Sequence, residues 1–293
     1  MGKLIRCITS DGAIMVSAVD STDIVAKAEE LHKSSAVVTA ALGRLLTAGA
    51  MMGNMLKGEN SSISLKIDGG GPAGAVTVSA DSTGNVRGYA VNHIVEIPLK
   101  PNGKLDVSGA VGTEGNLFVV KNLGMKEPYN GFVPIVSGEI AEDITSYYAV
   151  SEQIPTACAL GVLVDTDLSV RKAGGYIIQL LPFTEDEIIT RLEKNLSEVK
   201  PVTELLEEGK DIEEIVREVL NGFEVEVIYT DYPEYKCKCS REKIEAVLQG
   251  LSEQDLEEMA NDEKNTEIKC HFCEKNYAFT PEEIKKIKKL KKI

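Results

Sequence analysis

Hydrophobic residues alternate with polar ones over several short segments of the chain, and this period of two predicts β-strands. Turn sequences such as Ser10-Asp11-Gly12 separate some of these segments and favour antiparallel hairpins. The predicted strands cover residues 4–9, 13–19, 62–68, 75–80, 86–91, 117–121, 158–164 and 176–181.

A different pattern predicts a long helix near the N-terminus. Residues 36–56 are small and apolar, and Gly49 and Gly53 have the G-x-x-x-G spacing of closely packed helices. Arg44 stands inside this run, where a charge at the centre of a bilayer costs about 2.5–3.5 kcal/mol, and no second apolar span exists. A buried helix of a folded domain is therefore the better interpretation.

The composition changes at Thr184, where Thr184-Glu185-Asp186-Glu187 has the form of a capping box. Two amphipathic helices are expected from here, one ended by Pro201 and one started by Asp211. The segment from Glu185 to Glu218 holds twelve acidic and five basic residues, half the net charge of the chain. Isolated helices of this length are marginal in water, so this segment must fold against its neighbours. Its apolar stripes are Ile188, Ile189, Leu192, Leu196 and Val199, and then Ile212, Ile215, Val216, Val219 and Leu220.

The last part of the chain contains short helical patterns after Ser240 and Ser252 and a terminal helix that begins near Pro281. A run of lysines follows in this terminal helix and is most simply a solvated helix end. The run consists of Lys285, Lys286, Lys288, Lys289, Lys291 and Lys292.

Together these patterns predict an α+β protein without regular βαβ alternation. Residues 1–183 are expected to form an N-terminal domain of largely antiparallel sheet with packed helices, including a helix over residues 139–152 that Ser137 starts. Residues 184–229 are expected to form a helical acidic linker. Residues 230–293 are expected to form a small C-terminal zinc-binding domain. A chain of 293 residues can build its main core without crosslinks, so the zinc segment is an addition to the fold.

Composition narrows the classes of function. The chain has 46 acidic and 32 basic residues, a formal charge of −14, which makes nucleic-acid binding unfavourable. The first residues contain no apolar stretch of signal-peptide length, so we expect a cytoplasmic protein without a membrane partner. In a reducing cytosol, cysteines serve metal binding or redox sensing more often than stable disulfides.

Four cysteines near the C-terminus are the main candidates for chemistry. Cys237 and Cys239 form a C-x-C pair, and Cys270 and Cys273 form a C-x-x-C pair about thirty residues later. Two short chelating pairs supply the four thiolates that tetrahedral zinc prefers. We therefore expect one Zn²⁺ per chain in the reduced protein.

The other candidate residues do not indicate an enzyme. Cys7 and Cys158 lie in apolar, strand-like runs and are expected to be buried structural cysteines. His32 and His93 are isolated, and no nucleophile and base can be paired from the sequence. His271 lies between the second pair of cysteines but is not needed as a ligand when four thiols are present.

The zinc site has two interpretations, an inert structural site or a redox switch. Nearby cations favour thiolates, which oxidants attack. If Cys237 and Cys239 lie in an extended segment, their side chains point to opposite faces, and a disulfide between them demands backbone rearrangement. Structural zinc contributes about 10–16 kcal/mol in small metallo-peptides, against about 5–15 kcal/mol for the stability of a whole domain. Loss of the metal should therefore melt the C-terminal segment and uncover the linker stripes. The nearby cations are Lys236, Lys238, Arg241, Lys269 and Lys275.

Two other classes of function remain open on the residues alone. A dithiol oxidoreductase would use Cys270 and Cys273, although the sequence has no βαβ setting for such a motif. A zinc-ribbon module that binds nucleic acid would be opposed by the acidic charge of the chain.

Several segments resemble the bacterial 33-kDa heat-shock chaperone family, and the resemblance spans essentially the whole chain. The stretch at Asn92-His93 departs from the Asn-Pro that is usual in the family, which affects the expected shape of one loop. The segments that carry the resemblance are Cys237-Lys238-Cys239-Ser240-Arg241-Glu242, Cys270-His271-Phe272-Cys273, residues 136–144 and 151–155, Arg87-Gly88-Tyr89-Ala90 and Gly174-Gly175-Tyr176.

The resemblance implies an ATP-independent holdase that is inactive while it is reduced and zinc-bound. Oxidative stress, often together with heat, would link Cys237 to Cys239 and Cys270 to Cys273, release zinc and unfold the linker. The surface exposed in this way would capture unfolding client proteins. The resemblance also implies a homodimer in the active state and hand-over of clients to the ATP-dependent 70-kDa chaperone system.

Overall fold

The computed structural model describes residues 2–262 and 264–290, and the chain divides into two compact units, Met1–Lys236 and Cys237–Ile293. Helices and antiparallel sheets occur in both units, so the predicted α+β class is confirmed. The placement of the domain boundaries after residues 183 and 229 stays a prediction.

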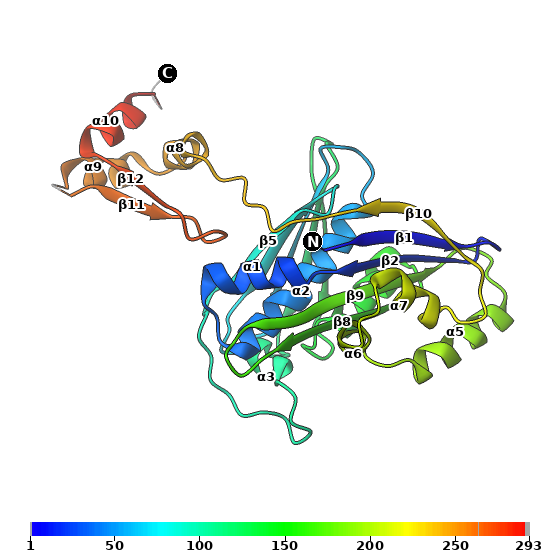
Figure 1. Ribbon diagram of the computed structural model, residues 1–293. Coiled ribbons are helices and arrows are strands. Elements are labelled where there is room, and N and C mark those ends of the chain that lie inside the picture. Colours follow the sequence, from blue (N-terminus) through cyan, green and yellow to red (C-terminus); the bar gives the residue numbers. More distant parts are fainter. Residues whose placement is uncertain (1, 263, 291–293) are drawn as a thin grey trace. The chain divides into compact units, whose positions relative to one another are not determined.

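The first unit contains two antiparallel sheets, with strand orders β10-β1-β2-β9-β8 and β5-β4-β3-β6-β7 (Figure 1). The predicted strands correspond to strands of these two sheets, although β9 starts earlier than expected. The first sheet consists of β1 (Leu4–Thr9), β2 (Ile14–Asp20), β8 (Thr156–Val164), β9 (Val170–Leu180) and β10 (Val225–Asp231). The second consists of β3 (Ser62–Asp68), β4 (Val76–Asp81), β5 (Val86–Ala90), β6 (Asn116–Asn122) and β7 (Tyr129–Pro134).

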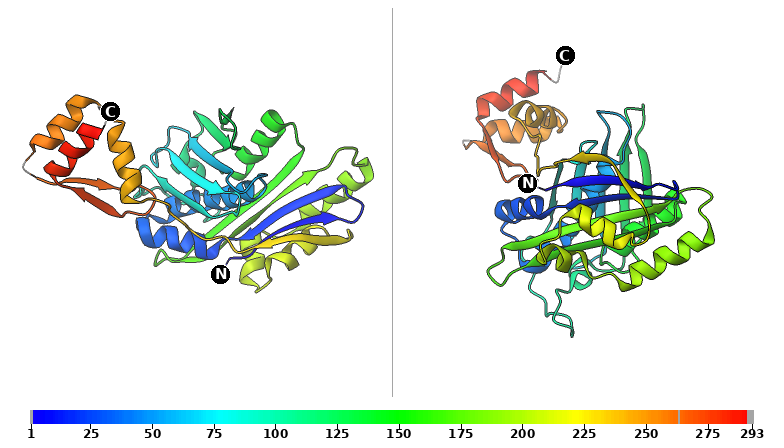
Figure 2. Two further views of the ribbon diagram at one scale, coloured as in Figure 1. Left: turned by 90° about the horizontal axis from the view of Figure 1, so that it is seen from above. Right: turned by 45° about the vertical axis from the view of Figure 1, so that its right-hand side comes forward.

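Helix α2 (Ala36–Asn54) lies between the two sheets (Figure 2) and is buried along almost its whole length. Gly49 allows close packing, because an added Cβ would lie 2.7 Å from Val78 Cγ1 on β4. Among the described residues, α2 is the one helix long and apolar enough to cross a membrane, and 89% of its most apolar window is buried in this fold. The remaining helices before residue 153 are α1 (Thr22–His32), α3 (Val107–Val111), α4 (Ala141–Tyr147) and the π-helix η1 (Tyr148–Glu152).

Three helices of the predicted linker, α5 (Asp186–Glu198), α6 (Val202–Glu207) and α7 (Ile212–Val219), pack on the outer face of the first sheet. Asp211 caps α7 by accepting hydrogen bonds from the backbone nitrogens of Glu213 and Glu214, both at 2.9 Å. The predicted second stripe faces the sheet. The side chains that form this layer from the linker are Leu192, Val202, Leu205, Leu206, Ile212, Ile215, Val216, Val219 and Leu220, all at most 5% exposed.

After α7 the chain returns to the first sheet as β10, which pairs with β1, and then reaches the second sheet. Val86 N donates a hydrogen bond to Glu234 O at 3.0 Å, and Lys236 N donates to Val86 O at 2.8 Å. The hydroxyl of Tyr235 donates to Gly88 O at 2.8 Å. The residues that directly precede Cys237 are therefore fixed to both sheets of the first unit.

Two predicted helix starts are wrong. The helix expected from Glu139 begins at Ala141 and becomes a π-helix at Tyr148. The carboxylate of the fully buried Asp143, rather than the Ser137 hydroxyl, binds the backbone at its start, with Ile140 N donating to Oδ2 at 2.9 Å. Thr184 does not cap α5, because its hydroxyl donates to Leu181 O at 2.7 Å.

The second unit is a small α+β body with its own apolar core. A two-stranded sheet, β11 (Thr266–Lys269) and β12 (Asn276–Phe279), packs with α8 (Arg241–Gln249), α9 (Glu253–Asn261) and α10 (Pro281–Leu290). Lys291 and Lys292 of the predicted lysine run lie outside the described residues. The core side chains are Leu248, Leu256, Ala260, Tyr277, Phe279, Ile284 and Ile287, which surround the cysteine pairs.

Candidate metal centre

Each cysteine pair is positioned by the backbone that follows it. Cys237 and Cys239 lie in a segment without regular secondary structure, directly before Ser240, whose hydroxyl caps α8. Cys270 and Cys273 lie in the turn between β11 and β12, where Cys270 N donates to Lys275 O at 3.0 Å. This bond closes the turn so that both thiols point to the same side.

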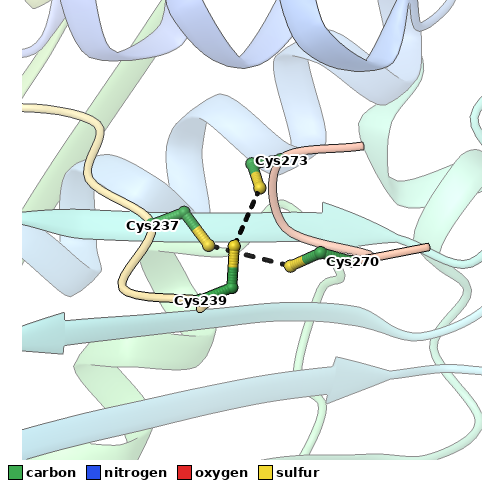
Figure 3. Close-up of side chains that lie close together, drawn as sticks. All are labelled: Cys237, Cys239, Cys270 and Cys273. Carbon is green, nitrogen blue, oxygen red and sulfur yellow. Dashed lines mark hydrogen bonds between the residues drawn. The ribbon is translucent and has the colours of Figure 1, made fainter. Parts of the chain in front are cut away.

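The four thiols converge on one point (Figure 3). The Sγ atoms of Cys237 and Cys270 are 3.7 Å apart, and those of Cys239 and Cys273 are 3.4 Å apart. All four sulfur atoms lie within 4.8 Å of one another. A regular tetrahedron with Zn–S bonds of about 2.3 Å has S···S edges of about 3.8 Å, so this donor set fits zinc in size, number and chemistry.

The surroundings of the thiols are largely apolar. Cys270 is 8% exposed, and the other three are half-buried. Burial raises the pKa of the Cys237 and Cys273 thiols. Burial also acts to raise the pKa of Cys239, but the hydrogen bond from the Tyr277 hydroxyl at 3.1 Å, together with the neighbouring thiols, lowers it to about 7. A bound cation would favour the thiolate form of all four.

The cations that were expected to favour thiolates contact other groups. Arg241 lies over the ring of Phe279, 4.2 Å from its centroid, and donates to Glu283 Oε1 at 2.8 Å. Lys269 forms an ion pair with Glu274. In the structure, the lowered pKa of Cys239 therefore comes from hydrogen bonds rather than from these cations.

The structure corrects the expectation that Cys237 and Cys239 point to opposite faces. Their segment is not a strand, and their two sulfur atoms face the same centre (Figure 3). This arrangement suits shared coordination of one ion. The argument that a strand geometry opposes a disulfide between these two residues therefore does not apply to this structure.

The remaining residues that the sequence singled out take no part in the four-sulfur cluster. One of them, Cys158, differs from its predicted burial. The cluster consists of the four cysteines, and His271 supplies no atom to it. Cys7 is buried as predicted, and burial raises its pKa to about 11. Cys158 is only half-buried because β8 is an edge strand.

Sequence reasoning assigned no specific role to Tyr277. Tyr277 is 6% exposed, and its hydroxyl bonds to a candidate ligand. The alternation of Tyr277 and Phe279 in Asn276–Phe279 is the signal that could have placed both rings on the inner face of a strand. No sequence rule predicts the hydroxyl–thiol contact itself.

Comparison with known proteins gives consistent results over the whole chain. A family model described as Hsp33 protein matches residues 2–280. The 33 kDa chaperonin of Clostridium perfringens strain SM101 is 49% identical over 286 residues, which cover 97% of this chain and 90% of that protein. The 33 kDa chaperonin of Lachnoclostridium phytofermentans is 48% identical over 284 residues, which cover 97% of each. The crystal structure of the 33 kDa chaperonin (heat shock protein 33 homolog) of Thermotoga maritima superposes with a TM-score of 0.90 at 37% identity, covering 99% of this chain and 98% of that chain.

Proposed function

Because this chain belongs to the Hsp33 protein family, we propose that it is a redox-regulated, ATP-independent chaperone that binds unfolding proteins and has no enzymatic activity. In the reduced, zinc-bound state it is inactive. Oxidation of the cysteines releases zinc, loosens the linker and exposes apolar surface. The observation that carries this proposal is that the linker helices cover an apolar sheet face and connect to the cysteine site through β10 and residues 232–236.

Zinc would be held by Cys237, Cys239, Cys270 and Cys273 in the reduced state. When bound, the ion supplies a crosslink between the segment before α8 and the turn between β11 and β12. Among the described residues of the second unit, eight buried apolar residues form the core, and Cys270 is one of them. A core of this size cannot maintain the fold without a further crosslink, so its order depends on the thiol site.

The sheet face under the linker is strongly apolar. It presents Ile14, Val16, Ala18 and Ile178 to the linker helices, and each of these side chains is at most 1% exposed. A fully buried side chain of this kind contributes about 1.5–3 kcal/mol, so the covered face is a strong binding surface once it is uncovered. The shortest of the covering helices, α6, is Val202–Glu207, too short to be stable by itself.

The redox step is an oxidation of paired thiols by a peroxide. Each pair loses two electrons and two protons and forms one S–S bond, while one hydrogen peroxide is reduced to two water molecules. The pairs proposed are Cys237 with Cys239 and Cys270 with Cys273. A disulfide sulfur is a much weaker zinc ligand than a thiolate, so the ion leaves.

Two sulfur contacts in the reduced structure run between the pairs, at 3.7 Å for Cys237–Cys270 and 3.4 Å for Cys239–Cys273, and both are far longer than a disulfide bond. Local rearrangement must therefore accompany the proposed pairing. Peptide mass spectrometry of the oxidised protein tests this point directly. Recovery of a Cys237–Cys270 linkage as the main product would contradict the proposed pairing and would instead follow the contacts of the reduced state.

The proposal includes partners and location. Unfolding proteins are the clients, the active form is a homodimer, and bound clients pass to an ATP-dependent 70-kDa chaperone system. The protein acts in the cytoplasm, where reduced thiols are the resting state. Size measurements of reduced and oxidised protein test the dimer, and refolding of a bound client with and without the 70-kDa system tests the hand-over.

The central experiment follows zinc and chaperone activity together. Reduced, zinc-loaded protein is treated with hydrogen peroxide at raised temperature, and released zinc and suppression of aggregation of thermally unfolding citrate synthase are measured in the same samples. Both should rise together and reverse with dithiothreitol. Zinc release without suppression of aggregation would refute the proposal. Catalytic reduction of insulin disulfides by the reduced protein would instead indicate a dithiol oxidoreductase.

A further inference from the structure

The last strand of the first sheet, β8 (Thr156–Val164), is an edge strand with unusual composition. Its sequence, TACALGVLV, contains no charged residue and no proline. It pairs on one side with β9, and all nine of its residues are half-buried. Edge strands in natural proteins are normally protected by charges, proline, bulges or a covering segment. The β8 edge has neither charged residues nor proline along its length.

The half-burial of β8 has a specific geometric cause. Side chains of Cys158, Leu160 and Val162 pack against the core around α2, whereas Ala157 and Ala159 pack against the core under the linker. Gly161 also faces the linker, since an added Cβ would lie 2.7 Å from Thr203 Cγ2. Both faces of the strand are thus covered. The part of β8 that remains open is its backbone edge.

The hydrogen-bond register identifies which backbone groups point out of this edge. Leu180 N donates to Pro155 O, and antiparallel pairing alternates, so residues 157, 159, 161 and 163 bond to β9. The N–H and C=O groups of Cys158, Leu160 and Val162 therefore point away from β9. Within the part of the chain that the structure describes, no backbone partner is recorded for them.

A hollow of about 690 Å³ lies along this edge. Residues 159–166 form its floor, Ala36 and Ala40 of α2 form one wall, and residues 201–203 at the start of α6 form another. Arg44 at the hollow is neutralised by Glu139, whose Oε2 lies 2.6 Å from its guanidinium. Lys104 and Asp165 also line the hollow, so the edge lies in a recessed, largely apolar groove with few charges.

We propose that the free edge of β8 binds an extended, uncharged apolar segment of an unfolding client by strand addition. This inference rests on the proposed chaperone function and names the place where its client binds. The partner must supply a free backbone, because backbone donors and acceptors are what the groove leaves open. An unfolded chain has such a backbone in every segment, so the edge supplies the sequence-independent part of recognition and the apolar groove selects uncharged apolar segments.

A second folded copy of this chain fits the groove less well. Its own β8 lies at the floor of the same kind of groove between α2 and α6, so two such edges cannot approach without displacing their walls. Each copy also carries a charge of −14, which opposes close approach. An unfolded segment without flanking helices has neither obstacle.

Release of the linker would enlarge this binding site. Residues 201–203 form one wall, and the side chains of Ala157 and Ala159 pack under the linker helices. When the linker unfolds, this face of β8 becomes exposed beside the already open edge. A client could then pair with the backbone and place alternate side chains on the uncovered apolar face.

Amide hydrogen exchange tests the proposal at the level of single residues. The probes are a capped decapeptide of alternating valine and serine and unfolding citrate synthase, each added to reduced and to peroxide-treated protein. The amides of Cys158, Leu160 and Val162 should exchange at least about tenfold more slowly with either probe bound to the oxidised protein. The amides of Ala159 and Gly161, which bond to β9, should change little and serve as the internal control.

Two substitutions at one position separate the backbone from the side chain. Val162→Pro removes one outward N–H and spares the ladder to β9, whereas Val162→Ala truncates the side chain and keeps the N–H. Val162→Pro should weaken decapeptide binding about tenfold, equivalent to about 1.4 kcal/mol. Val162→Ala should bind as the wild type does. Equal affinities for the Pro and Ala variants, both confirmed as folded by circular dichroism, would overturn the proposal.

The outcomes distinguish this inference from the proposed function. If the oxidised protein suppresses aggregation but the three outward amides are unchanged with client bound, the edge is not the client site and the chaperone function stands. If it suppresses no aggregation yet the decapeptide protects these amides, the strand-addition site stands and the chaperone function falls. A third outcome is that these amides become protected when only the protein concentration is raised, with dimer formation that Val162→Pro abolishes. Both results together would assign the β8 edge to a second copy of the chain and overturn the proposal.

Discussion

Ile215 offers the sharpest test of how the linker is held on the sheet. It lies at the centre of the apolar face of α7 and is 0% exposed. We expect Ile215→Glu to detach the linker from the sheet and give partial chaperone activity in the reduced, zinc-bound protein. The N-terminal core around α2 is a separate cluster, so the rest of the first unit should stay folded.

The magnitude of this effect follows from burial. Truncation of a buried isoleucine to alanine typically costs about 2–5 kcal/mol, and placing a carboxylate in the same apolar site adds a desolvation cost. Short helices such as α7, Ile212–Val219, have little stability of their own. A loss of this size should therefore raise the open population of the linker by at least about thirtyfold, since 2 kcal/mol corresponds to that factor.

Limited trypsin digestion under reducing conditions measures the open population, because Lys194 and Lys210 lie within the linker. Arg217→Glu is the matched control. It introduces the same side chain on the exposed face of the same helix and loses an ion pair with Glu213 that is worth about 0.3–0.5 kcal/mol. Ile215→Glu should be cleaved at both lysines much faster than wild type, and the control only slightly faster.

Two results would refute this reasoning. Cleavage at Lys194 and Lys210 as slow in Ile215→Glu as in wild type would show that the apolar stripe does not hold the linker. Fast cleavage without any suppression of aggregation in the reduced state would show that linker release does not activate the protein. The second result would leave the packing argument intact and remove its functional consequence.

Three further outcomes are expected. Reduced protein should retain one zinc ion per chain after dialysis. Cys273→Ser should lower zinc affinity at least about tenfold, as measured by competition with a chromogenic chelator. Unchanged zinc affinity of this variant would argue against Cys273 as a ligand. Burial opposes ionisation of Glu139, but Lys100 and Arg44 hold the pKa of its carboxyl below the ordinary 4.5. The ion pairs of Glu139 therefore stabilise the fold fully above pH 4.5. This stabilisation is lost as the pH falls through the lowered pKa. Glu139→Gln should therefore cost about 1.5–3 kcal/mol at pH 7 in urea unfolding, with a smaller cost below pH 4; a pH-independent cost would contradict the ion-pair explanation. Tyr235→Phe should destabilise the first unit by about 1 kcal/mol through loss of the bond to Gly88 O, and a wild-type melting curve would show that this bond contributes nothing.

Much of the fold could be predicted from the sequence because several strands, β3, β4 and β5 among them, alternate buried and more exposed side chains. The segment Ser62–Asp68 was predicted with the bounds that the structure has, since one of its faces is buried and the other is solvated. The strand β10 was not predicted, although Val225 and Val227 alternate with glutamates in its sequence. The preceding acidic helices favoured a linker interpretation there, and only pairing with β1 makes the segment a strand.

The sequence predicts which four cysteines come together, whereas their role as zinc ligands stays a prediction. Cysteine spacing identified the four thiols, because chelating pairs are a local property of the sequence. The errors in the predicted helix starts at Ser137 and Thr184 arise because each hydroxyl forms its hydrogen bond outside the first turn of the helix. The Thr184 hydroxyl donates to Ala13 O at 3.0 Å, a partner that tertiary structure brings close, whereas the Ser137 hydroxyl accepts from Glu139 N at 3.1 Å, ahead of the helix. A capping rule that considers only neighbouring residues cannot predict a partner as distant in the sequence as Ala13.

The antiparallel pairing of β10 with β1 determines the direction in which the first unit would come apart. Asp231, the end of β10 nearest the cysteines along the chain, pairs with Leu4, and Val225 at the far end pairs with Thr9. Tension applied to the chain at Cys237 would therefore break the hydrogen bonds between β10 and β1 one residue pair at a time, from Asp231 towards Val225. It would not load all the pairs at once. The hydrogen bonds that join Glu234 and Lys236 to Val86 lie between Cys237 and this ladder, so they must break before β10 separates from β1 and frees the chain that leads back to α7.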